Sequence, residues 1–132
     1  MKNITAIKAK RYGVYTCQPQ TTLREAVRIL VAEDISALVV VDDDGRLQGI
    51  ISRSDLVRVR YYQEDWAEKL VGSAMSAEVV TVTQHDPLEA VMALLLERQI
   101  HRVVVVRQEK NGVTPVSVLS AADILYHMDQ ES

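Results

Sequence analysis

Apolar residues recur with helical spacing in two stretches of the chain. In the first stretch the positions i, i+3, i+4, i+7 and i+8 are occupied by Leu23, Ala26, Val27, Leu30 and Val31. In the second stretch the same positions are occupied by Leu88, Val91, Met92, Leu95 and Leu96. This spacing gathers the apolar side chains on one face of an α-helix. The sequence therefore predicts two amphipathic helices, each with one face buried in a core.

Strands are predicted after each of these helices. Residues 38–41 and 103–106 are β-branched or leucine throughout, too short for a helix and apolar on both faces, which is typical of buried strands. Turn residues follow at positions 42–45 and 110–112. A second strand returns after each turn, over residues 47–51 and 116–119.

The two stretches are copies of one unit. Residues 23–41 overlay residues 88–106 without a gap, at the 65-residue offset that separates Leu23 from Leu88. Thr16 and Thr81 share this offset, and each ends a short apolar stretch that predicts one further strand. Ser52 and Ser120 are plausible N-caps of last helices over residues 54–63 and 121–127. Each copy is thus predicted to be β-α-β-β-α.

Neither copy is large enough to bury its helix and sheet faces alone, although the 132-residue chain is 48% hydrophobic. We expect an α+β fold in which the two motifs are related by a pseudo-twofold axis and pack through their sheets. The expected boundaries are 1–72 for motif 1 with the N-terminal segment and linker, and 73–132 for motif 2. The connector over residues 65–76 should contain a helical turn around residues 66–71.

Composition and charge bear on the compartment and the binding partners expected for this protein. The net charge of −3 argues against nucleic-acid binding. No apolar run is long enough to span a bilayer, and the N-terminus lacks the apolar core of a secretory signal. The single Cys17 suits a reducing compartment, and a buried apolar role is favoured over a reactive one. We expect a cytoplasmic protein that binds neither membrane nor nucleic acid.

A short motif at the end of each second strand carries the functional signal. It reads Gly-Ile-Ile-Ser-Arg-Ser-Asp over residues 49–55 and Ser-Val-Leu-Ser-Ala-Ala-Asp over residues 117–123. A helix N-terminus favours phosphate, and an ionised aspartate three residues later suits the paired hydroxyls of a ribose. The alternative is a capping box, in which the aspartate caps backbone N–H groups and nothing binds. Two copies in matching context favour the nucleotide site.

With these motifs the chain resembles a stand-alone pair of cystathionine-β-synthase (CBS) domains, or Bateman module, over residues 14–128. The second copy differs from the family pattern in having Ser117 where glycine is usual. The resemblance implies that Asp123 and Asp55 hold ribose hydroxyls, that Ser120 and Ser52 contact phosphate, and that adenine lies between the copies. For the Asp123 site the adenine segments are Val14, Tyr15, Ile35, Ser36 and Ala37. For the Asp55 site, which includes Arg53, they are Val79, Val80 and Ile100.

A second resemblance concerns the ligand's phosphates. Ile100-His101-Arg102 followed by four valines is similar to the phosphate-binding segment of AMP-activated protein kinase gamma subunits. It implies that His101 and Arg102 contact phosphate at the Asp123 site, whereas the equivalent Ser36 and Ala37 are uncharged. Alternatively, His101 packs or caps at the turn and Arg102 is a solvent-facing charge.

Other candidate chemistry is weak. The run Asp42-Asp43-Asp44 lacks the spacing of a calcium loop and predicts a solvated turn. His85 and His127 have no partners at metal-ligand spacing and are expected on the surface. No nucleophile comes with a histidine and a carboxylate that the repeat would bring together, so we expect no enzyme and no obligatory cofactor.

These observations predict a regulatory sensor that binds AMP, ADP or ATP, with S-adenosylmethionine or NAD as further possibilities, and that acts on a regulated protein encoded elsewhere. The terminal helices carry more apolar and aromatic residues than one small core needs, which predicts a homodimer. In the family such helices usually make a flat disk. The competing hypothesis is a ligand-free dimerisation or scaffold module in which both motifs only cap helices.

Overall fold

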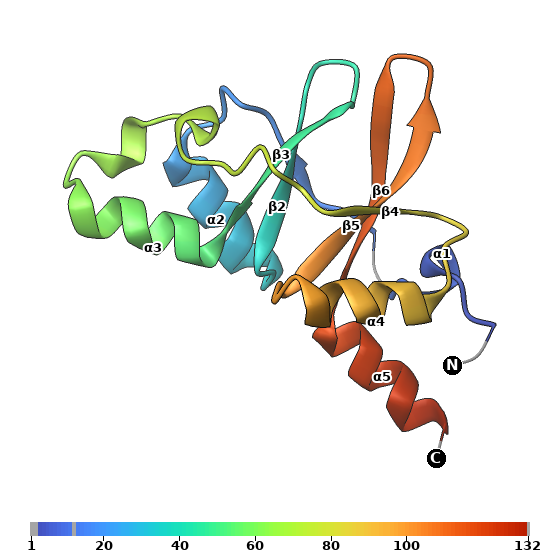
Figure 1. Ribbon diagram of the computed structural model, residues 1–132. Coiled ribbons are helices and arrows are strands. Elements are labelled where there is room, and N and C mark those ends of the chain that lie inside the picture. The colour runs from blue at the N-terminus through green and yellow to red at the C-terminus, as the bar shows by residue number, and fades with distance from the viewer. Residues whose placement is uncertain (1–2, 12, 132) are drawn as a thin grey trace. The chain divides into compact units, whose positions relative to one another are not determined.

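The computed structural model describes residues 3–11 and 13–131 as two compact units, each built on a three-stranded sheet (Figure 1). The first repeat unit comprises Tyr15–Glu78. The second repeat unit joins the N-terminal segment up to Val14 with the chain from Val79 onward. The mixed α+β class predicted from the sequence is confirmed.

The first repeat unit follows the predicted order of elements. They are β1 (Thr16–Cys17), α2 (Leu23–Glu33), β2 (Ala37–Val41), β3 (Leu47–Ser52) and α3 (Arg53–Tyr62). Strand β2 lies between β1, which runs parallel to it, and β3, which runs antiparallel. Two 3₁₀ turns, η1 (Trp66–Glu68) and η2 (Val71–Ser73), form the predicted helical part of the connector.

The second repeat unit has the same order and the same sheet topology. Its elements are β4 (Thr81–Thr83), α4 (Leu88–Glu97), β5 (Arg102–Glu109), β6 (Gly112–Ser120) and α5 (Ala121–Glu131). A short helix, α1 (Ala6–Ala9), precedes the repeats and was not predicted.

Several boundaries differ from the prediction. The short strands begin at Thr16 and Thr81, where the prediction had them end. The residue before each strand already contributes its backbone carbonyl group to the sheet. Tyr15 O accepts from Val39 N at 3.1 Å, and Val80 O accepts from Val104 N at 3.0 Å. The second hairpin is longer than predicted, since residues 107–109 still pair with residues 112–114 beyond an irregularity between Val105 and Val106.

Each sheet packs its helix on one face, as the apolar pattern predicts, except that Val31 and Leu96, predicted on that buried face, are 75% and 78% exposed. In the first unit Leu23, Ala26 and Leu30 share a core with Leu38, Val40 and Ile51. In the second unit Leu88 and Val91 share a core with Val103, Val105 and Leu119. The intervening Val39 and Val104 are also fully buried, which confirms that both central strands are apolar on both faces.

The N-terminal helix completes the core of the second repeat, although the sequence grouped residues 1–72 with the first. Ala6 and Ala9 are fully buried in the cluster that contains Leu88 and Val91. Ala6 N donates to Asp86 O at 2.8 Å, and Leu88 N donates to Ile4 O at 2.9 Å. The small side chains of α1 permit this close packing, which no periodic pattern could reveal in so short a helix.

The connector makes the equivalent contacts in the first repeat. Leu23 N donates to Lys69 O and Val71 N donates to Thr21 O, each at 2.8 Å. The isolated bridges Thr5↔Pro87 and Thr22↔Leu70 are related by the same repeat offset. We call residues 4–9 and 69–74 the lead segments, because each precedes one repeat in sequence and packs into the other. A cut between residues 72 and 73 would therefore remove part of both cores.

Candidate functional site: two Ser-Asp corners

Both repeats present a serine and an aspartate where a strand turns into a helix. We call these pairs the Ser-Asp corners. In the first corner Ser52 accepts from Asp55 N at 3.4 Å, while Asp55 Oδ2 accepts from Ser52 N at 2.8 Å. In the second corner Asp123 Oδ2 accepts from Ser120 N at 2.8 Å. The capping alternative therefore describes the local hydrogen bonds correctly, with a complete capping box at Ser52 and Asp55.

Capping occupies only one oxygen of each carboxylate. Oδ2 also accepts from the serine hydroxyl in both corners, at 3.0 Å from Ser52 and 3.3 Å from Ser120. Oδ1 faces a different partner in each case. Since an ionised carboxylate only accepts hydrogen bonds, Oδ1 is suited to a guanidinium or to ligand hydroxyl groups. Helix capping and ligand binding are thus compatible at the same aspartate.

In the second corner the aspartate forms an ion pair with an arginine that the sequence did not predict as part of the site. Arg11 Nε donates to Asp123 Oδ1 at 2.8 Å, and the two side chains are 27% and 8% exposed. The Arg11 guanidinium also lies over the Tyr126 ring, 5.2 Å from its centroid. Arg11 precedes its partner by 112 residues, and no spacing in the sequence links them.

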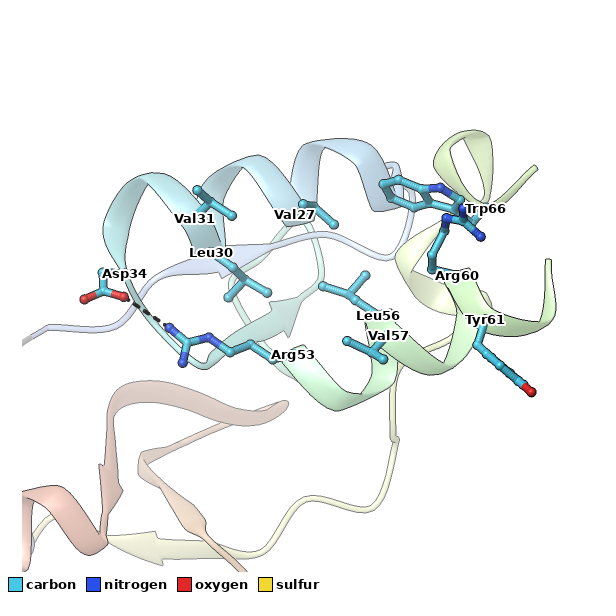
Figure 2. Close-up of a pocket in the computed structure, with 10 residues that line it drawn as sticks. All are labelled: Val27, Leu30, Val31, Asp34, Arg53, Leu56, Val57, Arg60, Tyr61 and Trp66. Atoms are coloured by element: carbon cyan, nitrogen blue, oxygen red, sulfur yellow. Dashed lines mark hydrogen bonds and ion pairs between the residues drawn. The ribbon is translucent and has the colours of Figure 1, made fainter. Parts of the chain in front are cut away.

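The first corner is more open. Asp55 Oδ1 pairs with Arg58 Nη1 at 3.3 Å, but the Arg58 side chain is 64% exposed and belongs to the same helix. An exposed pair of this kind contributes little to stability, because water competes for both charges. Arg53, predicted to contact ligand, extends to Asp34, with Nη2 3.3 Å from Oδ1 (Figure 2).

The strand register brings the predicted phosphate-binding residues beside the second corner. Arg102 pairs directly with Ser120 across the β5–β6 hairpin, as Ala37 pairs with Ser52 in the first repeat. Arg102 is half-buried and the neighbouring His101 is exposed. The second corner therefore has a cationic flank within its own repeat, whereas the flank of the first corner is uncharged.

The remaining site residues divide between the two units. Tyr15, Ile35, Ser36 and Ala37 lie in the first unit, while Val14, Val79, Val80 and Ile100 lie in the second. Tyr15 donates its hydroxyl to Glu33 at 2.9 Å, and this hydrogen bond together with the Glu33 charge raises the pKa of the phenol. Each predicted site combines residues of both units, and that combination stays a prediction.

The structure also decides several secondary expectations. Asp42 Oδ1 accepts from Asp44 N and Arg46 N at 2.9 Å each, so the acidic run forms the predicted turn. Cys17 is buried as predicted, and desolvation raises the pKa of its thiol to about 11. Among residues 3–11 and 13–131 no cluster of three His, Cys, Asp or Glu side chains could hold a metal ion.

One histidine prediction is wrong. His85 is exposed as expected, but His127 is half-buried and its Nε2 lies 2.8 Å from Ala9 O. The contact arises because α1, absent from the predicted fold, packs against α5. Within the part of the chain that the structure describes, no helix has both the length and the apolarity to cross a membrane.

Comparison with known families agrees with this architecture. Residues 8–62 and 71–130 match the family model described as CBS domain. The chain belongs to the CBS domain family. This CBS pair is 30% identical over 118 residues to an inosine-5'-monophosphate dehydrogenase from Halobacterium salinarum, covering 89% of the chain and 23% of that enzyme. An uncharacterised 33.4 kDa protein of Thermofilum pendens is 29% identical and covers 97% of the chain, which spans 44% of its length.

Solved CBS structures share the fold of this CBS pair. The CBS domain pair of protein MJ0100, in complex with 5-methylthioadenosine and S-adenosyl-L-methionine, superposes with a TM-score of 0.85 at 22% identity, covering 98% of each chain. CBSX2 in complex with AMP superposes with a TM-score of 0.83 at 24% identity, covering 97% of this chain and 98% of the other. These similarities establish the architecture of the repeats.

Proposed function

We propose that this CBS pair is a regulatory module, without catalytic activity of its own, that binds an adenosine-containing ligand between its repeats. AMP, ADP and ATP are the favoured ligands. The observation that carries the proposal is that in each corner Oδ2 caps the helix, whereas Oδ1 takes no part in the cap and pairs with an arginine that a ligand could displace or share. Related CBS pairs of similar fold are described in complex with AMP and with S-adenosyl-L-methionine, which supports the ligand class.

In the proposed Asp123 site, Asp123 binds the ribose hydroxyls and Ser120 contacts phosphate. His101 and Arg102 supply the positive charge that phosphate oxygens need, and the pairing of Arg102 with Ser120 supports this assignment. Adenine contacts come from the first unit and from the chain entering it, through Val14, Tyr15, Ile35, Ser36 and Ala37.

In the proposed Asp55 site, Asp55, Ser52 and Arg53 bind the sugar and phosphate, and Val79, Val80 and Ile100 line the adenine. Ser36 and Ala37, which lie beside this corner, are uncharged. A phosphate bound here therefore meets less positive charge than one bound at the Asp123 site. We therefore expect the Asp55 site to discriminate less between adenosine and AMP than the Asp123 site does.

Thermal unfolding of the full chain tests the proposal. A ligand at about one hundred times its dissociation constant adds roughly 2.7 kcal/mol of stability, which raises the melting temperature by several degrees. We expect AMP, ADP or ATP to produce this shift, with S-adenosylmethionine and NAD tested in parallel. Asp123→Ala should reduce the AMP shift more than Asp55→Ala does. If all five compounds leave the melting temperature unchanged, the sensor proposal is wrong.

A ligand-free dimerisation module is the second candidate. It is favoured by the hydrogen bonds in both corners and by exposed apolar side chains on α3 and α5, among them Val57 and Leu125. In this alternative Asp123→Ala lowers stability modestly and changes no nucleotide response. Both candidates include a disk-like cytoplasmic homodimer, which we propose as the assembly. In the sensor candidate, ligand binding reaches a regulated protein through this homodimer.

A further inference from the structure

The two Ser-Asp corners take their arginine from different parts of the chain. In the first repeat it comes from the same helix, because Arg58 follows Asp55 by three residues on α3. The residue at the equivalent place on α5 is Tyr126, three residues after Asp123. In the second repeat the arginine comes from the N-terminal segment, as Arg11. Both aspartates thus have a cationic partner, but only the second has one from outside its own helix.

The chain that follows each lead segment shows the same difference. Arg11 lies two residues after the first lead segment, and Ser76 lies two residues after the second. Ser76 is uncharged and forms two backbone hydrogen bonds with Ile50, each 2.9 Å long. The chain after the lead segment therefore brings a cation to the second corner and brings a neutral residue to the first repeat.

Two contacts of different kinds hold Arg11. Its Nε donates to Asp123 Oδ1 at 2.8 Å, and its guanidinium lies over the Tyr126 ring, 5.2 Å from the centroid. Ligand hydroxyl groups would compete for Oδ1, whereas the contact with the ring does not involve the carboxylate. A guanidinium displaced from Oδ1 can therefore stay beside the corner, because its attraction to the Tyr126 ring remains.

The proposed phosphate position lies at the other oxygen of the same carboxylate. Asp123 Oδ2 accepts from Ser120 N at 2.8 Å and from the Ser120 hydroxyl at 3.3 Å. Ser120 is therefore adjacent to the group that Arg11 binds. A guanidinium pairs with phosphate oxygens as readily as with carboxylate oxygens. A phosphate at Ser120 would give a displaced Arg11 a new anionic partner.

We propose that Arg11 determines the ligand selectivity of the Asp123 site by exchanging one anion for another. The ribose hydroxyls take Oδ1 of Asp123, and Arg11 moves from the carboxylate to the ligand phosphate. Adenosine brings no anion, and S-adenosylmethionine brings a sulfonium cation, so neither replaces the partner that Arg11 loses. The site therefore selects adenosine ligands that carry a 5′-phosphate. This inference rests on the nucleotide site proposed above and adds one residue to it.

Competition alone makes a different prediction. If Arg11 only occupies Oδ1, its removal strengthens the binding of AMP and of adenosine by the same factor. If Arg11 also pairs with phosphate, its removal strengthens adenosine binding but takes one contact away from AMP. The ratio of the adenosine and AMP dissociation constants then falls. A purely structural role for Arg11 leaves this ratio unchanged.

Isothermal titration calorimetry of the full chain with AMP and with adenosine measures the ratio. An Asp55→Ala background removes the first proposed site, so that the heat reports on the Asp123 site. We expect Arg11→Gln to lower the preference for AMP about tenfold or more, and Arg11→Lys to retain most of it. Arg107→Gln is the matched control, because it removes an arginine that pairs with Glu109 farther along the β5–β6 hairpin. It should leave the ratio unchanged.

An unchanged ratio in Arg11→Gln overturns the proposal, even where both ligands bind more tightly than to the parent. Should Arg11→Gln fail to fold, Tyr126→Leu takes its place, because it keeps the arginine but removes the ring that holds it. An unchanged ratio in that variant overturns the proposal as well. If the parent binds neither AMP nor adenosine, the nucleotide site itself is overturned together with the role of Arg11. Binding of both ligands with an unchanged ratio overturns the role of Arg11 and leaves the nucleotide site standing.

Discussion

Arg11 Nε donates to Asp123 Oδ1 over 2.8 Å, at the same oxygen that we propose for ribose hydroxyls. The pair is more enclosed than its counterpart in the first repeat, where Arg58 binds Asp55 from an exposed position. A ligand at Asp123 must therefore displace or share Arg11, whereas a ligand at Asp55 meets a weaker competitor. If ligand binds at the proposed sites, we therefore expect the N-terminal segment to respond to occupancy of the Asp123 site alone.

Replacing Arg11 by alanine should lower the melting temperature of the ligand-free protein, because a largely buried carboxylate loses its partner at a cost of about 1–3 kcal/mol. The same change should increase the melting shift produced by adenosine, which lacks phosphate and so isolates the competition for the carboxylate. Arg11→Lys is the control and should retain part of the pairing. A smaller adenosine shift in Arg11→Ala than in the parent would contradict competition.

The packing of residues 4–9 into the second repeat predicts that a change there destabilises that repeat first. Ala9→Asp places an unpaired charge in the core of the second repeat and should destabilise it by about 3 kcal/mol or more. Hydrogen exchange should show amides of β5 and β6 losing protection before those of β2 and β3. Lys8→Asp changes the charge of an exposed neighbour and should have little effect. Preferential loss of β2 and β3 would show that residues 4–9 serve the first repeat instead.

Gly49 is required by packing within the first repeat. A Cβ atom at this position would lie 2.6 Å from Ser76 O and 2.8 Å from Met75 Sδ. Gly49→Ala should therefore cost about 1–3 kcal/mol in urea unfolding, because it pushes the connector away from β3. Gly13→Ala, where nothing lies within 4 Å, is the control and should stay within about 0.5 kcal/mol of the parent. Equal stabilities for the two variants would refute this role.

Burial of Cys17 predicts a pH dependence. The folded-state pKa of about 11 lies above the ordinary value of 9.0, so the unfolded thiol loses its proton first as pH rises. The corresponding stabilisation is complete below pH 9 and is lost between pH 9 and 11. Cys17→Ala should lack this component of the stability curve. Ellman's reagent at pH 8 should react slowly with folded protein and rapidly in denaturant; rapid reaction in the folded state would show an accessible thiol.

The repeat, the amphipathic helices, the buried central strands and both Ser-Asp corners were predictable from local patterns. Helical and strand periodicity, turn residues and a three-residue spacing between serine and aspartate all act over a few neighbouring positions. Duplication strengthened each inference, because Leu23 and Leu88, or Asp55 and Asp123, occur in matching surroundings.

The features that distinguish the two corners came from contacts between distant parts of the chain. Arg11 reaches Asp123 across 112 residues, and His127 reaches Ala9 across 118. Such contacts follow from packing of the N-terminal residues 4–11, a segment too short to carry a periodic signal. Specific pairing of this kind depends on where folding brings two side chains, and their spacing along the chain does not encode it.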